Sequence, residues 1–475
     1  MTPSDKTRLA WSAGLALLGA VAAASMFGFT VDDAWISVRY ARHLASGAGY
    51  RFNVGGDITD GVTPLVFPWL LVPLAKGSPL EVLERVKVVG VVVWSLTAGL
   101  LGRRIAASPA ALIDRLLAAL LVVIAVPLAA HAASGMETPL ATGLATCAAC
   151  MMHRPRLAAV LAGMAALFRP ELVVWAASFA LGAEFAARRR IAPVARAVPS
   201  AVVNALLASA PFLLVVVARM VVFGRPGPLA LVAKPADLAQ GLLYLVASAA
   251  ALTPIVAFAP RAAARAGGRA AVLGAAAVAH CVAVAFVGGD WMPYARLFVP
   301  IAPGLALVAC DSGPFASAWA RALRGGLALA YGVFLLLGAA PVGRRVGEHR
   351  HALAERARPW LEGLGSVAAV DIGWPSSVFE GTLVDLAGLT DPAIAALPGS
   401  HTSKRVDAAL LLDRRPDALL FYAERRPGDP WNEVRYMHLV ERRLATSELV
   451  EKHYVPRTYL PLVGDKGYVL WMRRE

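Results

Sequence analysis

The 475-residue sequence is poor in charged side chains. Asp, Glu, Lys and Arg make up 16% of the residues, against 58% that are hydrophobic, and the mean hydropathy is +0.61. A soluble protein of this length cannot bury so much apolar surface, because roughly half apolar residues is typical. Several apolar runs exceed the roughly 18 residues that cross a bilayer as a helix. The composition therefore predicts an integral membrane protein.

Two further patterns are missing. No stretch alternates polar and apolar residues as a membrane strand would, so the spans are predicted to be helical. No basic face with interleaved aromatic residues is present, although the formal net charge is +14, and nucleic acid is therefore not an expected partner. Most of the excess positive charge lies instead in short loops between apolar runs, where it acts as a topology signal.

Cysteine is also scarce. Cys147, Cys150, Cys281 and Cys310 all lie inside apolar runs, and none follows position 310. The Cys147-x-x-Cys150 spacing allows a redox or metal pair, but buried small side chains are the favoured interpretation. The first apolar run, from Leu9 to Phe29, lacks the small-residue cleavage site of a signal peptide and is predicted to be a retained span.

We predict about eleven membrane-spanning helices. Their approximate ranges are 10–29, 85–102, 115–131, 138–152, 156–168, 171–187, 199–222, 238–259, 270–288, 297–311 and 324–341. With a cytoplasmic N-terminus, positively charged residues gather in the cytoplasmic loops, as the positive-inside rule requires. These residues are Lys6, Arg8, Arg103, Arg104, Arg115, Arg154, Arg156, Arg188, Arg189, Arg190, Arg196, Arg261, Arg265, Arg269, Arg321 and Arg324. The predicted protein is therefore a multi-pass protein of the plasma (inner) membrane with an extracytoplasmic C-terminus.

Two domains are predicted. Residues 1–342 form a polytopic α-helical membrane module, whose first outer loop covers 30–84. Within this loop a helix is expected from Ala34 to about Ser46, and Pro64–Ala75 suits a helix lying in the membrane interface, with Trp69 at headgroup depth. Residues 343–475 form an extracytoplasmic α/β domain, in which short apolar runs at 366–372, 418–422 and 468–472 are expected to be strands.

Asp32 and Asp33 stand directly outside the first predicted span. Capping of the helix that begins at Ala34 requires only one of these carboxylates, so the other is available for a different role. A carboxylate beside a low-dielectric groove has a raised pKa and can act as a general base. Asp32 and Asp33 are therefore the candidate catalytic residues, alongside the capping interpretation.

Cationic side chains in the outer loops could contact an anionic ligand. Arg39 and Arg42 lie on one face of the helix after Asp33, where they could hold an anion or contact lipid headgroups. Lys234 could neutralise a phosphate or extend to the membrane surface. Asp290 and Arg296, six residues apart, could pair with each other or bind a polar ligand. Arg39, Arg42, Lys234, Asp290 and Arg296 are therefore candidates for binding an anionic or polar ligand.

Further polar and aromatic residues complete the predicted outer face. Glu137, Arg169 and Glu171 lie at the outer ends of spans, where charged groups face a cavity or orient neighbouring helices. Trp291 and Tyr294 could line the site or belong to the aromatic belt. These five residues are predicted to line a substrate groove. An enzyme on this face cannot use cytosolic nucleotide sugars, so an activated sugar would have to arrive on a polyprenyl phosphate.

The order of these motifs resembles GT-C superfamily membrane glycosyltransferases, and most closely their terminal arabinofuranosyltransferase-like branch. The resemblance is carried by Asp32–Arg42, Gly47–Asn53 and Asp60–Leu65, and continues over nearly the whole chain. Its later parts are Ser134–Thr138, Arg169–Glu171, Phe223–Lys234, Gly288–Arg296 and Val384–Pro392. The family places its general base at the start of the first outer loop, which corresponds to Asp32 or Asp33, with Asp32 the first choice.

The resemblance implies an inverting transferase, with Arg39, Arg42, Lys234, Asp290 and Arg296 as its donor-binding residues. It would move a sugar, arabinofuranosyl or similar, from a polyprenyl-phosphate donor to a cell-envelope glycan on the outer face of the membrane. No cofactor is specified, although Asp32, Asp33 and Asp290 could supply oxygen ligands to a divalent cation. The main alternative is a transporter or flippase of lipid-linked sugars, and a third is a non-catalytic envelope scaffold. A transporter or flippase would need polar residues through the bilayer depth, and such proteins often consist of repeated halves.

Overall fold

The computed structural model describes residues 5–188, 194–256, 265–312, 317–426, 430 and 433–474. Within these ranges the protein is mostly helical, with a mixed β-sheet near the C-terminus. Three of the arginines predicted to lie in cytoplasmic loops, Arg189, Arg190 and Arg261, lie outside the described residues, as does the end of the predicted span 238–259.

The chain divides into two compact units. The first, which we call the helical unit, comprises Met1–Thr30, Val86–Ala218 and Ala236–Arg344. The second, which we call the mixed unit, comprises Val31–Arg85, Arg219–Pro235 and Arg345–Glu475. The first predicted outer loop therefore belongs to the same unit as the C-terminal α/β region, a grouping that no sequence pattern indicated.

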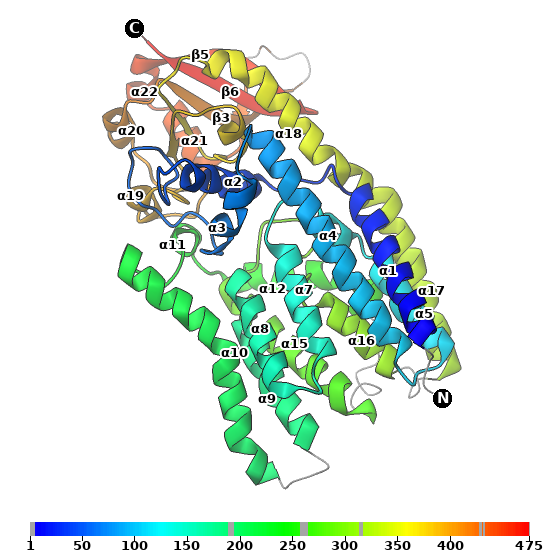
Figure 1. Cartoon of the computed structure of the whole chain (residues 1–475). Coiled ribbons are helices and arrows are strands. Elements are labelled where there is room, and N and C mark those ends of the chain that lie inside the picture. The colour runs from blue at the N-terminus through cyan, green and yellow to red at the C-terminus, as the bar shows by residue number, and fades with distance from the viewer. Residues whose placement is uncertain are drawn as a thin grey trace. The chain divides into compact units, whose positions relative to one another are not determined.

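The helical unit consists of long apolar helices and shorter ones between them (Figure 1). Their bounds are Asp5–Ser25 (α1), Pro79–Ala106 (α4), Leu112–Val123 (α5), Val126–Ala132 (α6), Thr138–Cys150 (α7), Pro155–Phe168 (α8), Leu172–Arg188 (α9), Val194–Phe223 (α10), Leu238–Ala251 (α12), Thr253–Val256 (α13), Gly268–Val287 (α15), Ala302–Ser312 (α16) and Ala318–Phe334 (α17). A π-helical turn, Leu335–Ala339, leads from α17 into α18, Ala340–Leu361, most of which belongs to the mixed unit.

Five of the described helical segments are long and apolar enough to cross a membrane: Asp5–Ser25, Pro79–Ala106, Ala195–Phe223, Gly268–Val287 and Ala318–Leu361. Helices α5 and α6, bent by 49° relative to each other, count as a sixth if they form one span. Shorter apolar helices, among them α7, α8 and α12, coincide with other predicted spans. The total of eleven spans and their sidedness stay predictions.

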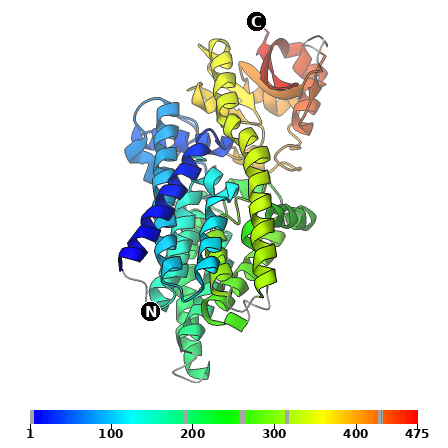
Figure 2. The same cartoon turned by 90° about the vertical axis from the view of Figure 1, so that its right-hand side faces the viewer.

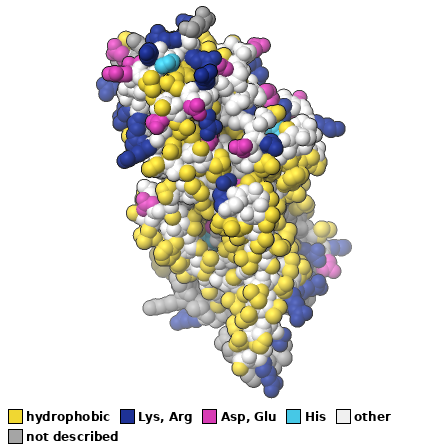
Figure 3. Space-filling model, turned by 90° about the vertical axis from the view of Figure 1, so that its left-hand side faces the viewer, with side chains coloured by type: hydrophobic (Ala, Val, Ile, Leu, Met, Phe, Trp, Pro, Cys, Tyr) yellow, Lys and Arg dark blue, Asp and Glu magenta, His cyan; other side chains and the backbone are white. Residues whose placement is uncertain are grey.

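Small residues and exposed apolar side chains both characterise the helical unit. A side chain at Gly19 of α1 would touch Ala98 of α4, and one at Gly163 of α8 would meet the backbone of α10. Such close approach is typical of helices packed in a membrane. Phe286, on the outside of α15, is 67% exposed, and hydrophobic side chains make up much of the surface of the long helices in Figure 3. This surface suits lipid better than water.

The mixed unit begins with helices from the first loop. Helix α2 covers Asp32–Ala45, followed by the short α3, Phe67–Leu71, and a 3-10 turn, Val72–Leu74. The expected interfacial stretch is thus a pair of short helical turns, on which the Trp69 side chain is 56% exposed. Residues 219–235 add the end of α10 and α11, Leu229–Ala233.

The C-terminal part of this unit is a six-stranded sheet. Its main order is β2-β1-β3-β6-β5, with β4 paired to β3. β1 runs parallel to β2 and β3, and the other pairs are antiparallel. The strands are Ser366–Ala369 (β1), Thr382–Asp385 (β2), Ala418–Glu424 (β3), Arg435–Tyr436 (β4), Tyr454–Val463 (β5) and Lys466–Arg473 (β6). The three predicted strand runs are confirmed as β1, β3 and β6.

Helices cover both faces of this sheet (Figures 1 and 2). One face packs against apolar residues of α2 and α18, including Ile36, Tyr40 and Leu353. The other face packs against helices that connect the later strands. These helices are α20 (Ala408–Arg414), α21 (Leu439–Ala445) and α22 (Glu448–His453). Because the first face is completed by α2, the first loop supplies part of the hydrophobic core of the C-terminal region.

Buried polar contacts connect the three segments of the mixed unit. The Arg219 guanidinium is 2.6 Å from the Asp60 carboxylate, and both side chains are at most 2% exposed. Arg39 is also buried and donates to the carbonyl oxygens of Phe52, Phe379 and Gly381 at 2.6–2.7 Å. Hydrogen bonds to a buried charge are among the stronger ones in proteins. These contacts fix the first loop against the C-terminal region.

Candidate functional site

Asp32 lies in the first turn of α2, but it does not cap that helix. The N-cap position is occupied by Val31, and no side chain caps the helix there. The Asp32 carboxylate instead accepts backbone hydrogen bonds from Gly373 (N to Oδ2, 3.1 Å) and Trp374 (N to Oδ1, 3.0 Å). Both donors follow strand β1 of the C-terminal sheet. Of the two sequence interpretations of Asp32, the structure thus disfavours capping.

The surroundings of Asp32 make its carboxyl group hard to ionise. Its pKa is raised to about 7, chiefly by burial; the nearby carboxylates Asp371 and Asp33 also raise the pKa, whereas Arg350 and the Trp374 N–H lower it. The side chain is nevertheless only partly buried. A partly accessible carboxyl group with a pKa near neutrality is suited to exchanging a proton with a ligand.

The residues around Asp32 form a connected polar network. Arg350 of α18 donates to the hydroxyl oxygen of Tyr468 at 2.9 Å and lies 4.0 Å from the Asp371 carboxylate. The Tyr468 hydroxyl donates to Asp371. The rings of Trp374 and Tyr468 lie 5.0 Å apart. Asp371, which lies near the end of the predicted strand run 366–372 and just after β1, is therefore held in a fixed position beside Asp32.

Sequence reasoning did not select Asp371, Arg350 or Tyr468. The signal available for Asp371 was its place at the end of an apolar strand run, since the carboxyl ends of parallel strands carry binding residues in α/β sheets. Arg350 and Tyr468 had no comparable signal, because their roles depend on contacts across more than one hundred residues.

Gly373 offers a direct test of how Asp32 is held. A Cβ atom at position 373 would overlap both the backbone oxygen and the carboxylate of Asp32. The Gly373→Ala variant is therefore expected to lose about 1–3 kcal/mol of stability, as overpacked sites do, measured by thermal unfolding of the purified protein.

Gly326 provides the matched control for this variant. It lies in α17 with no neighbour within 4 Å of an added Cβ atom. Alanine there should leave stability unchanged or raise it, because alanine favours helices over glycine. Equal melting temperatures for Gly373→Ala and the wild type would contradict the close contact between Gly373 and Asp32.

The predicted donor-binding residues of the mixed unit have different environments. Arg39 is buried among backbone carbonyls, which gives it a structural role, and its predicted donor contact stays a prediction. Arg42 is partly exposed and pairs with Glu380 at 2.7 Å. Lys234, at the C-terminal end of α11, is also partly exposed. Lys234 acts electrostatically on His401, whose pKa burial lowers to about 3 with contributions from Lys234 and His438.

The helical unit holds a second group of predicted site residues. Arg169, between α8 and α9, pairs with Glu137 at 2.9 Å and with Glu171 at 2.7 Å. The three side chains are 3%, 0% and 9% exposed, in that order. A charge buried this deeply in an apolar unit destabilises the fold unless an opposite charge is paired with it. The cluster lies at the ends of three apolar helices, and the predicted role of its residues in a substrate groove stays a prediction.

The loop after α15 carries the remaining predicted residues. Arg296 pairs with Asp290 at 2.6 Å, as one sequence interpretation expected. Trp291 is 68% exposed, whereas the Tyr294 hydroxyl donates to the carbonyl oxygen of Ala339 at 2.7 Å. Tyr294 and Ala295 have positive φ angles of 61° and 53°. Side-chain-bearing residues adopt this conformation only when their surroundings impose it, so the loop has a defined shape.

The predicted residues thus form two sets. Asp32, Asp33, Arg39, Arg42 and Lys234 belong to the mixed unit. The helical unit contains the others, Glu137, Arg169, Glu171, Asp290, Trp291, Tyr294 and Arg296. In the described part of the chain, no group of three or more His, Cys, Asp or Glu side chains is arranged to hold a metal ion.

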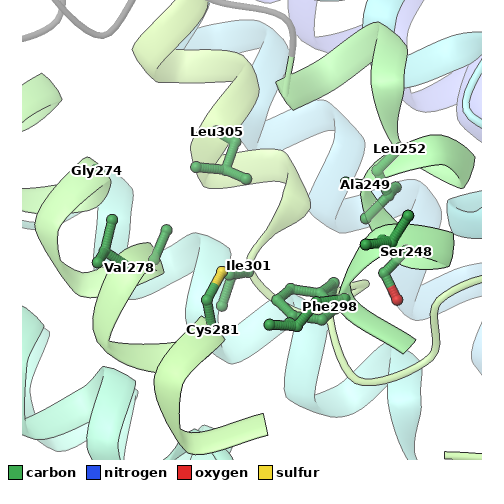
Figure 4. A pocket seen from close by; sticks show the side chains of 12 residues that line it. Ser248, Ala249, Leu252, Gly274, Val278, Cys281, Phe298, Ile301 and Leu305 are labelled. Atoms are coloured by element: carbon green, nitrogen blue, oxygen red, sulfur yellow. The ribbon is translucent and has the colours of Figure 1, made fainter. Parts of the chain in front are cut away.

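An apolar pocket of about 410 Å³ lies within the helical unit. It is lined by residues of α12 and α15 and by Phe298, Ile301 and Leu305. Figure 4 shows Val278 and Cys281 of α15 on one side of this space and Ser248 and Ala249 of α12 on another. Such a lining accommodates a hydrocarbon chain rather than a polar ligand.

No protein-family model matches the sequence, and searches of curated proteins and of solved structures find no significant match. Function must therefore be inferred from the residues and their geometry.

Proposed function

We propose that the protein is a multi-pass membrane glycosyltransferase of the GT-C type, with about eleven spans. It would transfer a sugar from a polyprenyl-phosphate donor to a cell-envelope glycan on the outer face of the plasma membrane, with inversion. The observation that carries the proposal is Asp32. Its carboxyl group is partly exposed, fixed by two backbone N–H groups, and has a pKa near 7, as a general base at neutral pH requires.

In the proposed reaction, Asp32 accepts the proton of an acceptor hydroxyl. The hydroxyl oxygen forms a bond to the anomeric carbon of the donor sugar as the bond from that carbon to the phosphate oxygen breaks. The leaving polyprenyl phosphate takes the electron pair, and the proton remains on Asp32 until solvent removes it. Attack opposite to the leaving group inverts the anomeric centre.

Charge that develops on the leaving phosphate requires nearby cations. In the mixed unit, Arg42 and Lys234 are partly exposed, so they are the residues of this unit that we assign to the donor phosphate. Arg296 is assigned to the donor by family resemblance. Its pairing with Asp290 leaves that assignment as a prediction.

A lipid-linked donor also needs a place for its chain. The exposed apolar surface of the helical unit and the pocket between α12 and α15 both suit an isoprenoid chain. These features support a lipid-borne substrate. A soluble sugar nucleotide would gain nothing from either.

The proposal is tested with purified protein and synthetic polyprenyl-phosphate sugars, both arabinofuranosyl and hexosyl, presented in detergent with oligosaccharide acceptors. We expect at least one donor to release polyprenyl phosphate and to extend the acceptor. If folded protein uses none of the donors but moves lipid-linked sugar across vesicle membranes, the transporter alternative is correct.

Sidedness is tested by cysteine labelling in a background where the four native cysteines are replaced by alanine. Ser46 and Arg154 are both exposed and lie in loops predicted to be on opposite sides of the membrane. A membrane-impermeant maleimide should label Ser46→Cys in intact spheroplasts, and Arg154→Cys only after permeabilisation. Labelling of both variants, or of Arg154→Cys alone, in intact spheroplasts would contradict the predicted topology.

A further inference from the structure

The strand order of the mixed unit creates a recognisable ligand-binding position. From β1 the chain passes to β2 on one side, and then returns past β1 to β3 on the other side. In open α/β sheets, ligands bind outside the carboxyl ends of the strands where the chain reverses direction in this way. In this sheet, that position lies between the carboxyl ends of β1 and β3.

The register shows which side chains occupy this position. Ala369, the last residue of β1, pairs with Leu420 of β3, and Asp371 and Tyr422 each follow two residues later in the chain. Tyr422 pairs in turn with Tyr468 of β6. Tyr422 and Tyr468 pack on the face of the sheet that also packs against α2, and their rings lie 5.2 Å apart. The Tyr468 hydroxyl donates to the Asp371 carboxylate, which places Asp371 next to these two rings.

His438 lies next to Tyr422, beyond the end of the sheet. We call Asp371, Tyr422 and His438 the row. The Tyr422 and His438 rings lie 5.5 Å apart, and the Met437 N–H donates to the Tyr422 carbonyl oxygen. A nitrogen of His438 lies 3.0 Å from the carboxylate of the fully buried Glu441, which orients the ring. The side chains of Asp371, Tyr422 and His438 are all partly exposed.

These groups match the chemistry of a sugar. A carboxylate and an imidazole exchange hydrogen bonds with hydroxyl groups, and a partly exposed tyrosine ring offers an apolar surface to the C–H face of a pyranose or furanose. Binding sites for small polar ligands combine such an apolar surface with a few fixed polar groups. Asp32 lies beside Asp371 at one end of the row.

We infer that the carboxyl edge of β1 and β3, through Asp371, Tyr422 and His438, binds the acceptor sugar whose hydroxyl Asp32 deprotonates. The inference rests on the proposed function, since the group that gives its proton to Asp32 must lie next to it. In this inference the acceptor sugar binds at the C-terminal sheet, whereas the donor phosphate binds at the cationic residues Arg42 and Lys234.

The test separates the two substrates. In the Tyr422→Ala and His438→Ala variants, the KM for the oligosaccharide acceptor should rise at least tenfold, while hydrolysis of the polyprenyl-phosphate sugar without acceptor stays within about threefold of wild type. Measurements are made at pH 8.5, which keeps Asp32 ionised in the variants and in the wild type. Tyr459→Ala is the matched control, since Tyr459 is a partly exposed tyrosine that packs on the opposite face of the sheet.

The outcomes are distinguishable from failure of the proposed function. If wild-type protein neither transfers nor hydrolyses any lipid-linked sugar, the proposed function fails, and the inference fails with it. If wild type is active but the acceptor KM is unchanged in both variants, the inference alone is overturned. Parallel loss of donor hydrolysis and transfer would also overturn it, because that result assigns the row to the donor or to folding. Saturation-transfer NMR with arabinofuranose and mannopyranose oligosaccharides should show contact with wild type, reduced in Tyr422→Ala.

Discussion

Replacement of Asp32 by asparagine is expected to lower the rate of sugar transfer by about 10²–10⁴-fold, the usual contribution of a general base. Asparagine keeps the size of the side chain but cannot take the acceptor proton. The rate is measured with saturating donor and acceptor, and thermal unfolding verifies that the variant is folded.

Asp33→Asn is the matched control, because the two carboxylates are adjacent in the first turn of α2. Asp32 is the carboxylate that Gly373 and Trp374 hold, so Asp33→Asn should retain far more activity. The reverse ranking would move the base to Asp33, and full activity in both variants would remove the base from this position.

The pH dependence of the wild-type enzyme should report the same group. The base works only when ionised, and burial raises the pKa of Asp32 to about 7. The rate is therefore expected to rise about tenfold per pH unit below pH 7 and to level off above it. A midpoint near pH 4 would indicate a carboxylate with an ordinary pKa and would exclude Asp32 in its observed surroundings.

The second large effect is expected at Arg169 in the helical unit. Arg169→Ala leaves two carboxylates, Glu137 and Glu171, buried without their cation. Removing one partner from a buried ion pair costs roughly 3–5 kcal/mol. We expect a large fall in the unfolding temperature of the purified protein in detergent, or failure to accumulate in the membrane.

Two further variants show whether charge causes this loss. Adding Glu137→Gln and Glu171→Gln to Arg169→Ala removes the uncompensated charges, so the triple variant should be more stable than the single one. Arg358→Ala breaks the exposed Arg358–Glu355 pair of α18, which should cost at most about 1 kcal/mol. Equal stabilities of Arg169→Ala and Arg358→Ala would mean that the buried cluster contributes little.

Local sequence patterns predicted the elements that depend on local signals. Apolar runs long enough for a bilayer became long helices, and three short apolar runs became strands β1, β3 and β6. Strand β5 was missed because Pro456 and Pro461 interrupt its pattern. Both prolines lie where the pairing with β6 is irregular, and β5 is an edge strand, the position where a sheet tolerates proline.

The candidate site was only partly predictable for a different reason. The Asp-Asp pair outside an apolar run marked Asp32 as unusual, but nothing local indicated that backbone groups more than 340 residues later hold its carboxylate. Arg39 shows the same limit. Its position on a helix near Asp32 indicated a ligand contact, whereas its partners Phe379 and Gly381 are defined only by the folded chain.

The three-segment construction of the mixed unit has a consequence for how the protein is made. Residues 31–85 leave the ribosome long before residues 345–475, yet α2 and the C-terminal sheet share one hydrophobic core. During synthesis the apolar side of α2 stays uncovered until the C-terminal sheet has been made. Contacts so distant in sequence also form slowly. The early loop therefore needs protection from aggregation until translation ends. A C-terminal fragment made alone would lack Ile36 and Tyr40 and would expose the face that they cover.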